Sequence, residues 1–417
     1  QRQMCIRDRS QHIGAPAQCV VNKGDHVKVG TLLAQANGFV SANIHSPVSG
    51  TVAKIENVTD SNGYTKAAVI IDVEGDEWEE SIDRSEKLVK GCPLTAKEIV
   101  DIIGEKGIVG LGGATFPSKV KLCPPPGNKA EILIINAVEC EPYLTNDHAL
   151  MLAKPEQIVE GVAILMKAIN VSKAVIGIEN NKPDAIATLS RVASGYLGIE
   201  VQPLKVRYPQ GGEKQLIDAI IRRQVASGAL PISTGAVVQN VATAYAVYEA
   251  VQKNKPLVER VMTVTGKSLK NPGNFLVRLG TPVANLIEAA GGLPEDSGKV
   301  ILGGPMMGRA AVSLSSPVGK GTSGVLIIPE SEATRKKEEP CIRCAKCVSA
   351  CPMGLEPYLL AKVSSLNMLD RAEKENIMDC IECGCCTFTC PANRPLLDYV
   401  RIGKSQVGAI IRSRAKK

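Results

Sequence analysis

The chain has 417 residues, of which 44% are apolar and only 3% aromatic, and its formal net charge is +7. This length corresponds to roughly three domains, and the low aromatic content predicts cores built from aliphatic side chains. No apolar run reaches the ~18–20 residues that a membrane-spanning helix needs, and no secretory signal is visible. We therefore expect a protein that is soluble, or bound to a membrane only through partners.

The positive charge lies mainly at the two ends of the chain. Residues 1–10 lack apolar periodicity, and we predict that they are unstructured or foreign and that the true N-terminus is missing or replaced. The basic tail, residues 401–417, carries no acidic residue. It is interpreted as a solvated end, or alternatively as a docking segment for an anionic lipid or an acidic partner. The near-neutral remainder argues against a nucleic-acid-binding protein.

Residues 11–75 are predicted to form short strands separated by the turns NKGD, ANG, PVSG and SNG. The order GDHVKVGTLL…IHSPVSGTVAKI resembles the barrel-sandwich hybrid of lipoyl and biotinyl carrier proteins. In those carriers a lysine at a hairpin tip takes the cofactor, and Phe39 stands at that position here. Because Phe39 has no amine to acylate, we expect this unit to be structural rather than a carrier.

The next region, residues 92–253, is predicted to be a Rossmann-like α/β domain. It opens with a helix at TAKEIVDIIGEKG, where Thr95 and Glu98 form a capping-box pattern. Three strand–helix pairs follow: 131–137 with 155–169, 173–179 with 183–194, and 199–206 with a helix from about Glu213. Such alternation predicts a largely parallel sheet with helices on its faces.

The pattern changes in residues 255–330, where short strands surround one helix at TPVANLIEAAGG. We expect a small mixed sheet that resembles the β-grasp ligand-binding module called SLBB. A charged linker, PESEATRKKEEP, leads into an α-helical, ferredoxin-like segment at 336–400.

That segment contains the same cysteine spacing twice, each time closed by Cys-Pro. We call residues 341–352 the first cysteine run and residues 380–391 the second cysteine run. In ferredoxins with two 4Fe–4S clusters, the fourth cysteine of each run binds the other cluster. The predicted ligands are therefore Cys341, Cys344, Cys347 and Cys390 for one cluster, and Cys380, Cys383, Cys386 and Cys351 for the other. Structural zinc is the alternative, but zinc favours two well-separated CxxC pairs. The surplus Cys385 is predicted to be a small buried residue and not a ligand.

A glycine-rich loop, GIVGLGGATFPSKVKL (107–122), follows the capped helix. Such loops bring backbone N–H groups close to a phosphate or a ring, although most are simply turns. Three further stretches accompany it: INAVECEPYLTNDHALM after a buried strand, RYPQGGEKQLI at a helix start, and VVQNVATA. The carboxyl end of a strand in an α/β sheet is where ligands bind.

Together these four stretches resemble the flavin- and NADH-binding subunit of respiratory complex I and of NAD-linked hydrogenases. The resemblance implies that FMN binds non-covalently to Gly110, Gly112, Gly113, Lys121, Asn136, Glu139, Gly212, Glu213, Gln239 and Asn240. It also implies NAD(H) contacts by Phe116, as a stacking surface, and by Glu141. Three positions depart from that family: Leu111 replaces an arginine, and Val138 and Lys214 each replace an acid. No side chain is expected to act as a catalytic acid or base.

As a whole, the chain resembles the C subunits of Rnf electron transport complexes, with signatures such as QHIGAPA, VECEPYLTND and LGGPMMG. This resemblance implies an oxidoreductase subunit that exchanges electrons between ferredoxin and NAD, coupled in the complex to Na⁺ or H⁺ movement. It implies a peripheral position on the cytoplasmic face of the cell membrane, docked to integral-membrane and iron–sulfur subunits. The alternatives are a soluble diaphorase subunit and a non-enzymatic iron–sulfur relay whose flavin pocket has decayed, which Leu111 favours.

Overall fold

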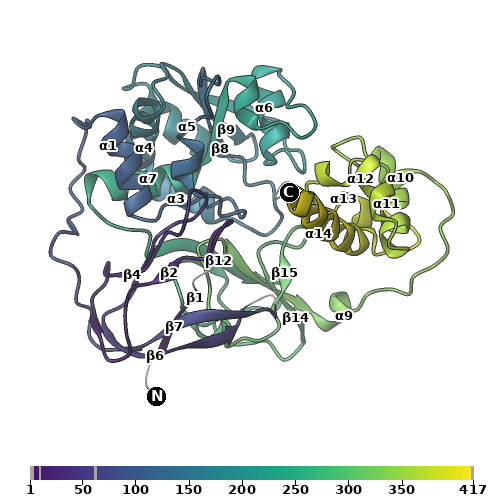
Figure 1. The fold of residues 1–417 in the computed structure, drawn as a ribbon, viewed down its shortest axis with the longest axis horizontal. Helices are drawn as coiled ribbons and strands as arrows, with labels where there is room; N and C mark the ends of the chain where they lie inside the picture. Colours follow the sequence, from purple (N-terminus) through teal and green to yellow (C-terminus); the bar gives the residue numbers. More distant parts are fainter. Residues whose placement is uncertain (1–3, 9–10, 61–62, 415–417) are drawn as a thin grey trace.

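The computed structural model describes residues 4–8, 11–60 and 63–414. It contains the four kinds of unit that the sequence predicts. In Figure 1 the α/β domain lies above the barrel-sandwich hybrid and the β-grasp unit, and the helical C-terminal domain lies to one side. The extended chain that follows α9 (Glu330–Ala333) connects this helical domain to the rest.

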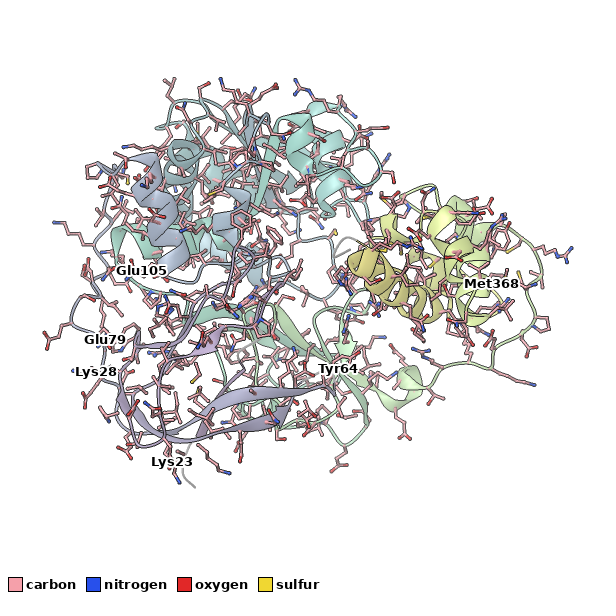
Figure 2. All side chains as sticks on the ribbon, viewed as in Figure 1. Lys23, Lys28, Tyr64, Glu79, Glu105 and Met368 are labelled. Atoms are coloured by element: carbon pink, nitrogen blue, oxygen red, sulfur yellow. The ribbon has the colours of Figure 1, made fainter. Side chains whose placement is uncertain are left out.

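The barrel-sandwich hybrid consists of two antiparallel sheets. Their orders are β1-β7-β6-β3 and β2-β4-β5. The strands are β1 (Met4–Asp8), β2 (Gln18–Cys19), β3 (His26–Val27), β4 (Leu32–Gln35), β5 (Ile44–His45), β6 (Gly50–Thr59) and β7 (Thr65–Val73). Phe39, at the position of the carrier lysine, is 73% exposed. Tyr64 follows the β6–β7 turn and lies on the side of this unit that faces the helical domain (Figure 2), whereas Lys23 and Lys28 lie on the other side.

The prediction that residues 1–10 are unstructured is wrong for Met4–Asp8. These residues form β1, which pairs antiparallel with β7, Met4 opposite Asp72 and Asp8 opposite Ala68. Cys5 is 4% exposed and belongs to the core of the unit. Backbone pairing at a sheet edge needs little from the side chains, so five residues without apolar periodicity gave no strand signal. Residues 1–3 and 9–10 lie outside the described residues.

The α/β domain is built around a four-stranded parallel sheet of order β10-β9-β8-β11. The strands are β8 (Ile132–Ala137), β9 (Ala174–Glu179), β10 (Ile199–Leu204) and β11 (Ala236–Asn240). The helices are α1 (Ala96–Glu105), α2 (Ser118–Lys121), α3 (Asn146–Ala153), α4 (Pro155–Ala168), α5 (Pro183–Ala193), α6 (Glu213–Ile221), η1 (Pro231–Thr234) and α7 (Val241–Gln252). The predicted capping box at Thr95 and Glu98 is confirmed.

The strand order determines where this domain can bind a ligand. The chain proceeds from β8 to β9 to β10 on one side, and then returns to place β11 on the other side of β8. Between β8 and β11 the connections therefore leave in opposite directions, which opens a crevice at the carboxyl ends of these two strands. Asn136 and Asn240 are paired in register at that edge.

The β-grasp unit is a mixed five-stranded sheet of order β13-β12-β16-β14-β15, with the predicted single helix α8 (Val283–Ala289). Its strands are β12 (Glu259–Gly266), β13 (Gly273–Arg278), β14 (Ser297–Leu302), β15 (Arg309–Ala310) and β16 (Gly324–Pro329). Only β12 and β16 pair in parallel. The loop between β14 and β15 contains the sequence GGPMMG.

The helical domain ends in the long helix α14 (Leu396–Arg414). The other helices are α10 (Lys346–Ser349), α11 (Pro357–Ser365), α12 (Leu369–Lys374), η2 (Ile377–Asp379) and α13 (Cys385–Phe388). The interpretation of residues 401–417 as a solvated tail is wrong up to Arg414, because these residues continue α14 and Val407 is buried in the core of the domain.

A glycine explains how α14 approaches α11 so closely. A Cβ atom added at Gly403 would overlap the Ser364 hydroxyl of α11. The basic residues of α14 form local contacts: Arg414 forms an ion pair with Glu373 at 2.8 Å, and Lys404 donates a hydrogen bond to the Cys380 carbonyl at 2.6 Å. The high content of Lys and Arg led to the prediction of a solvated end. The apolar residues of this segment are nevertheless spaced so that they pack on one face of a helix.

Candidate functional site

All four units line one cavity, with a volume of about 790 Å³. The α/β domain contributes the glycine loop at 112–115 and Glu141, and the β-grasp unit contributes residues of the loops 302–309 and 317–323. The barrel-sandwich hybrid adds residues near the β6–β7 hairpin, and the helical domain adds Ile381, Glu382 and Arg401. The predicted flavin loop is therefore connected by one cavity to the second cysteine run.

The glycine loop is held at its ends and open at its centre. The Gly110 N–H donates to the Phe116 carbonyl at 2.8 Å. A Cβ atom at Gly112 would meet only the Asn240 side chain, at 3.6 Å, and one at Gly113 would meet nothing within 4 Å. Gly113 has a φ of +112°, which favours glycine. The loop therefore offers exposed backbone beside Asn240.

The carboxyl ends of β8 and β11 bring together the predicted amide side chains. Asn136 donates to the Gly211 carbonyl at 2.8 Å. Asn240 caps α7 by accepting from the Ala242 N–H, and donates to Asp147 at 2.7 Å. Gln239 is 2% exposed, and among the described residues neither polar atom of its side chain has a hydrogen-bond partner.

A buried amide without a partner costs about 1–3 kcal/mol. A polar ligand in the crevice would satisfy it, so this edge of the sheet fits the predicted FMN. Nearby, Lys121 bonds the Glu213 carboxylate at 2.6 Å and the Val238 carbonyl at 3.1 Å. Glu213 begins α6 directly after Gly212. All ten predicted FMN residues therefore lie on the glycine loop with the adjoining α2, the carboxyl ends of β8 and β11, or the start of α6.

Glu139 and Asp147 form a buried acidic pair beside this edge. The Glu139 carboxylate accepts from the backbone N–H groups of Asp147 and His148, at 2.7 and 3.1 Å, at the start of α3. Burial, followed by the charge of Asp147, raises the pKa of Glu139 to about 8. Burial likewise raises the pKa of Asp147. Glu139 has a φ of +46°, a strained conformation typical of functional sites.

The two predicted NAD(H) residues have different surroundings. Glu141 lines the cavity, and its Oε1 accepts from the backbone N–H groups of Met306 and Met307 at 2.7 and 2.9 Å. Phe116 is half-buried at the end of the glycine loop and is not among the cavity-lining residues, which include the neighbouring Thr115.

The structure also shows the surroundings of Leu111, the position where the resemblance to the complex I subunit predicts an arginine. Leu111 is 3% exposed, and its carbonyl accepts from the guanidinium of Arg260 at 3.1 Å. Arg260 lies on β12 of the β-grasp unit and also donates to the Lys320 carbonyl at 2.6 Å. The buried guanidinium of Arg260, from the β-grasp unit, thus contacts the backbone of the glycine loop. The sequence offered no signal for it, because 149 residues separate the two partners.

The two cysteine runs have the same backbone conformation. Arg343 and Ala345 in the first run, and Glu382 and Gly384 in the second, all have positive φ values, of 56°, 58°, 58° and 80°. In each run one left-handed residue comes directly before the second predicted ligand, and another lies two positions before the third. Strain of this kind at non-glycine residues persists where the structure requires a particular geometry.

The cysteines are grouped across the runs. One small apolar cavity is lined by Cys351 of the first run and by Cys380, Cys383, Cys385 and Cys386 of the second. Conversely, Cys390 is close enough to Cys347 for its charge to raise the pKa of that thiol, although burial is the larger cause. Within the described residues, no group of three or more His, Cys, Asp or Glu could hold a single metal ion. A four-iron cluster is larger than an ion and keeps its ligands farther apart, so the donor set fits clusters of the predicted kind.

The sequence analysis missed several contacts that connect the α/β domain to the helical domain, at the second cysteine run and just after the end of the first. Tyr208, which precedes the predicted Gly212, donates its hydroxyl to the Cys383 carbonyl at 2.7 Å. Gln215 contacts the Met353 sulfur at 3.0 Å, and Lys214 lies 3.6 Å from Asp379. Lys214 stands where the resemblance to the complex I subunit predicts an acid, and its partner Asp379 is an acid of the helical domain.

Comparison with known families divides the chain in the same way. It matches the RnfC barrel sandwich hybrid domain over residues 3–76 and the Nuo51 FMN-binding domain over residues 103–249. It also matches the SLBB domain over 261–310 and the 4Fe–4S dicluster domain over 333–391. The first of these matches contradicts the prediction that the first ten residues are foreign, from residue 3 onward.

Similar proteins include the C subunit of the proton-translocating ferredoxin:NAD(+) oxidoreductase complex of Clostridium ljungdahlii, 46% identical over 95% of this chain and 86% of that protein. The C subunit of the Na(+)-translocating complex of Acetobacterium woodii is 43% identical over 97% and 91%. The C subunit of the ion-translocating oxidoreductase complex of Rhodobacter capsulatus is 40% identical over 95% and 76%. Among solved structures, a chain of an NAD+-reducing NiFe hydrogenase superimposes with a TM-score of 0.53 at 20% identity, covering 75% of this chain and 62% of that one. This last likeness concerns the fold alone.

Proposed function

Because the chain belongs to the family of C subunits of ion-translocating ferredoxin:NAD(+) oxidoreductase (Rnf) complexes, we propose that it passes electrons between NAD(H), FMN and two 4Fe–4S clusters within such a complex. The observation that carries the proposal is the single cavity that connects the glycine loop and Glu141 to Ile381 and Glu382 in the second cysteine run. An electron carrier must bring its donor and acceptor sites close together, and a cavity lined by segments about 270 residues apart supports this role.

FMN binds between the glycine loop and the carboxyl ends of β8 and β11. The open backbone at Gly112 and Gly113 and the cation of Lys121 receive its phosphate. Asn136, Gln239 and Asn240 supply amide groups, and the unpartnered Gln239 amide supports this assignment. When bound, FMN supplies the conversion between a hydride and the single electrons that clusters accept. The residues of this chain bind and orient it, and the enclosing units exclude water.

NAD(H) enters the cavity on the side of Glu141, and Phe116 lies next to the cavity-lining Thr115 at the end of the glycine loop. The Glu141 carboxylate disfavours a nucleotide with an additional phosphate, because two negative charges would be brought together in a partly enclosed space. NAD(H) is therefore preferred over NADP(H), and equal turnover of NADPH and NADH would contradict this assignment.

The two clusters are held crosswise between the cysteine runs, by the two sets of ligands that the sequence predicts. Cys385 is only half-buried, which corrects the prediction of a buried residue, and we assign it as a non-ligand that lines the second site. Burial and the neighbouring thiols raise the pKa of Cys385 and of Cys386 to about 12. Iron must displace the proton of the ligand thiol Cys386, so cluster assembly requires the metal and not merely the fold.

The protein docks on the cytoplasmic face of the cell membrane against integral-membrane and iron–sulfur subunits, and ferredoxin reaches it through them. In the described part of the chain, none of the helices combines the length and apolar character needed to cross a bilayer. Co-purification with membrane subunits tests this placement, and isolation as part of a soluble hydrogenase or dehydrogenase would instead favour the diaphorase alternative.

The decisive test is quantitation of iron, sulfide and FMN in anaerobically prepared protein. We expect about eight irons and one FMN per chain, with NADH bleaching the flavin absorbance. A colourless protein, or zinc in place of iron, would contradict the proposal. Clusters without flavin would indicate the non-enzymatic relay.

A further inference from the structure

We propose that the second cysteine run holds the cluster that exchanges electrons with the flavin site, and that Tyr208 is the positioning residue that ties that cluster to it. The inference rests on the proposed function, since it takes the FMN and both clusters as bound. With both cofactors bound, the second cluster would accept the two electrons of a hydride from NADH one at a time, passing the first to the other cluster before the next arrives, and one proton would be released to solvent.

The contacts between the α/β domain and the helical domain support this order. The Tyr208 hydroxyl donates to the carbonyl of Cys383, itself a predicted ligand. Gln215 contacts Met353, two residues after Cys351, and Lys214 pairs with Asp379, which directly precedes Cys380. Ser227 also bonds Asp379. Each of these contacts reaches a predicted ligand of the second cluster, or a residue within two positions of one.

The GGPMMG loop makes a second connection to the same run. Glu141 on the cavity wall holds the N–H groups of Met306 and Met307. On the other side of the loop, a Cβ atom at Gly384 would lie only 2.7 Å from the Met306 carbonyl. A side chain larger than hydrogen at position 384 would therefore push the loop away from the run. The first run has Ala345 at the equivalent position.

The first cysteine run faces elsewhere. Cys341 and Cys344 are exposed, and Ile342 between them is 68% exposed. Figure 1 shows α13 on the side of the helical domain nearer to the α/β domain, and α10, which begins within the first run, farther out. Met368 marks that outer flank in Figure 2. The first cluster is thus placed to exchange electrons with an external partner.

The Tyr208 hydroxyl has one proton to donate, and it donates this proton to the backbone carbonyl of the predicted ligand Cys383. The Tyr208 hydroxyl lies 2.7 Å from the Cys383 carbonyl, which has no proton of its own, so the tyrosine is the donor of this hydrogen bond. A hydrogen-bond donor beside a cluster stabilises the reduced state, which carries one more negative charge. Removing this donor should make the second cluster harder to reduce.

The test is the variant Tyr208→Phe in the full holoprotein, followed by an EPR-monitored redox titration. Tyr196→Phe is the matched control, because the Tyr196 hydroxyl donates to Glu160 at 2.7 Å within the α/β domain. The Cys344→Ala variant removes the first cluster and so identifies its signal. We expect Tyr208→Phe to lower the midpoint potential of the second cluster alone, with FMN content unchanged, and Tyr196→Phe to match the wild type.

The inference is overturned if the second-cluster potential in Tyr208→Phe is unchanged or rises, if both potentials shift together, or if the first cluster alone responds. These outcomes are separate from a failure of the proposed function. That failure would appear as missing iron or FMN in the wild-type protein, before any variant is compared.

Discussion

The two cysteine runs have the same spacing and the same left-handed backbone positions, but they have different surroundings. The second run contacts the α/β domain through Tyr208, and Cys383 and Cys386 are buried. The first run leaves Cys341 and Cys344 exposed. Since burial, nearby charge and hydrogen bonds set the potential of a cluster, a repeated ligand pattern can yield two unequal clusters. The difference teaches that the ligand loop is a local feature, whereas its role in a relay depends on its neighbours.

The largest effect is expected when one ligand cysteine is removed from either run. Cys383→Ala should remove one cluster, about half of the iron, and abolish reduction of the remaining cluster by NADH, because its link to the flavin is lost. Cys344→Ala should also remove about half of the iron, but NADH should still reduce the cluster that remains. Stopped-flow absorbance and EPR after addition of NADH measure both. Equal NADH reduction in the two variants would break the comparison.

The next effect concerns the helix on which both runs depend. Gly403→Val places a side chain where α14 meets Ser364 of α11. Overpacking of this kind costs about 1–3 kcal/mol or more, and here the clash is with a helix that supports both sites. We expect a lower unfolding temperature of the helical domain and partial iron loss from both clusters. Ser405→Val, at an exposed position of the same helix, is the control and should have little effect.

The next prediction concerns the stability of the α/β domain as a function of pH, which depends on the protonation of Glu139. Glu139 ionises near pH 4.5 when unfolded and at about 8 when folded, chiefly because of burial. Between these values the folded state keeps a proton that the unfolded state has lost, so the free energy of unfolding falls as the pH rises through this window. We expect the FMN-free α/β domain to lose about 2 kcal/mol between pH 6 and 8.

Differential scanning calorimetry would follow this change, with the helical-domain transition as internal reference. Each 1 kcal/mol corresponds to roughly 2–4 °C for a domain of this size. Glu139→Gln imitates the protonated acid and should make the unfolding temperature of the α/β domain less dependent on pH. An equally steep fall in the variant would assign the effect to another group.

The smallest expected effect is on the cluster potentials, when one lysine charge is removed near either run. Lys404 donates to the Cys380 carbonyl and bonds Glu382 at 3.2 Å, whereas Lys346 lies exposed in the first run. Lys404→Met should lower the second-cluster potential by an energy on the order of 1 kcal/mol, because the charge acts in a less polar environment. Lys346→Met should change the first-cluster potential less, since water and salt screen it. A larger shift for Lys346→Met in a redox titration would reverse the assigned environments.

Local patterns were enough to predict much of this protein. The strand–helix alternation predicted the parallel sheet, Thr95 and Glu98 predicted the start of α1, and the repeated cysteine spacing predicted paired cluster loops. These features depend on residues close together in the chain, where periodicity, capping and ligand spacing act directly.

Only the tertiary structure decided the rest. It paired Met4–Asp8 with β7, packed the basic end of the chain as α14, and placed Arg260 behind Leu111. It also set Tyr208 against Cys383, 175 residues away. Contacts between distant segments depend on how whole units pack, and a single side chain carries no sign of its remote partner. The sequence by itself therefore determined which groups this protein can hold, and the packing of its units decided which of the two cysteine runs lies beside the flavin site.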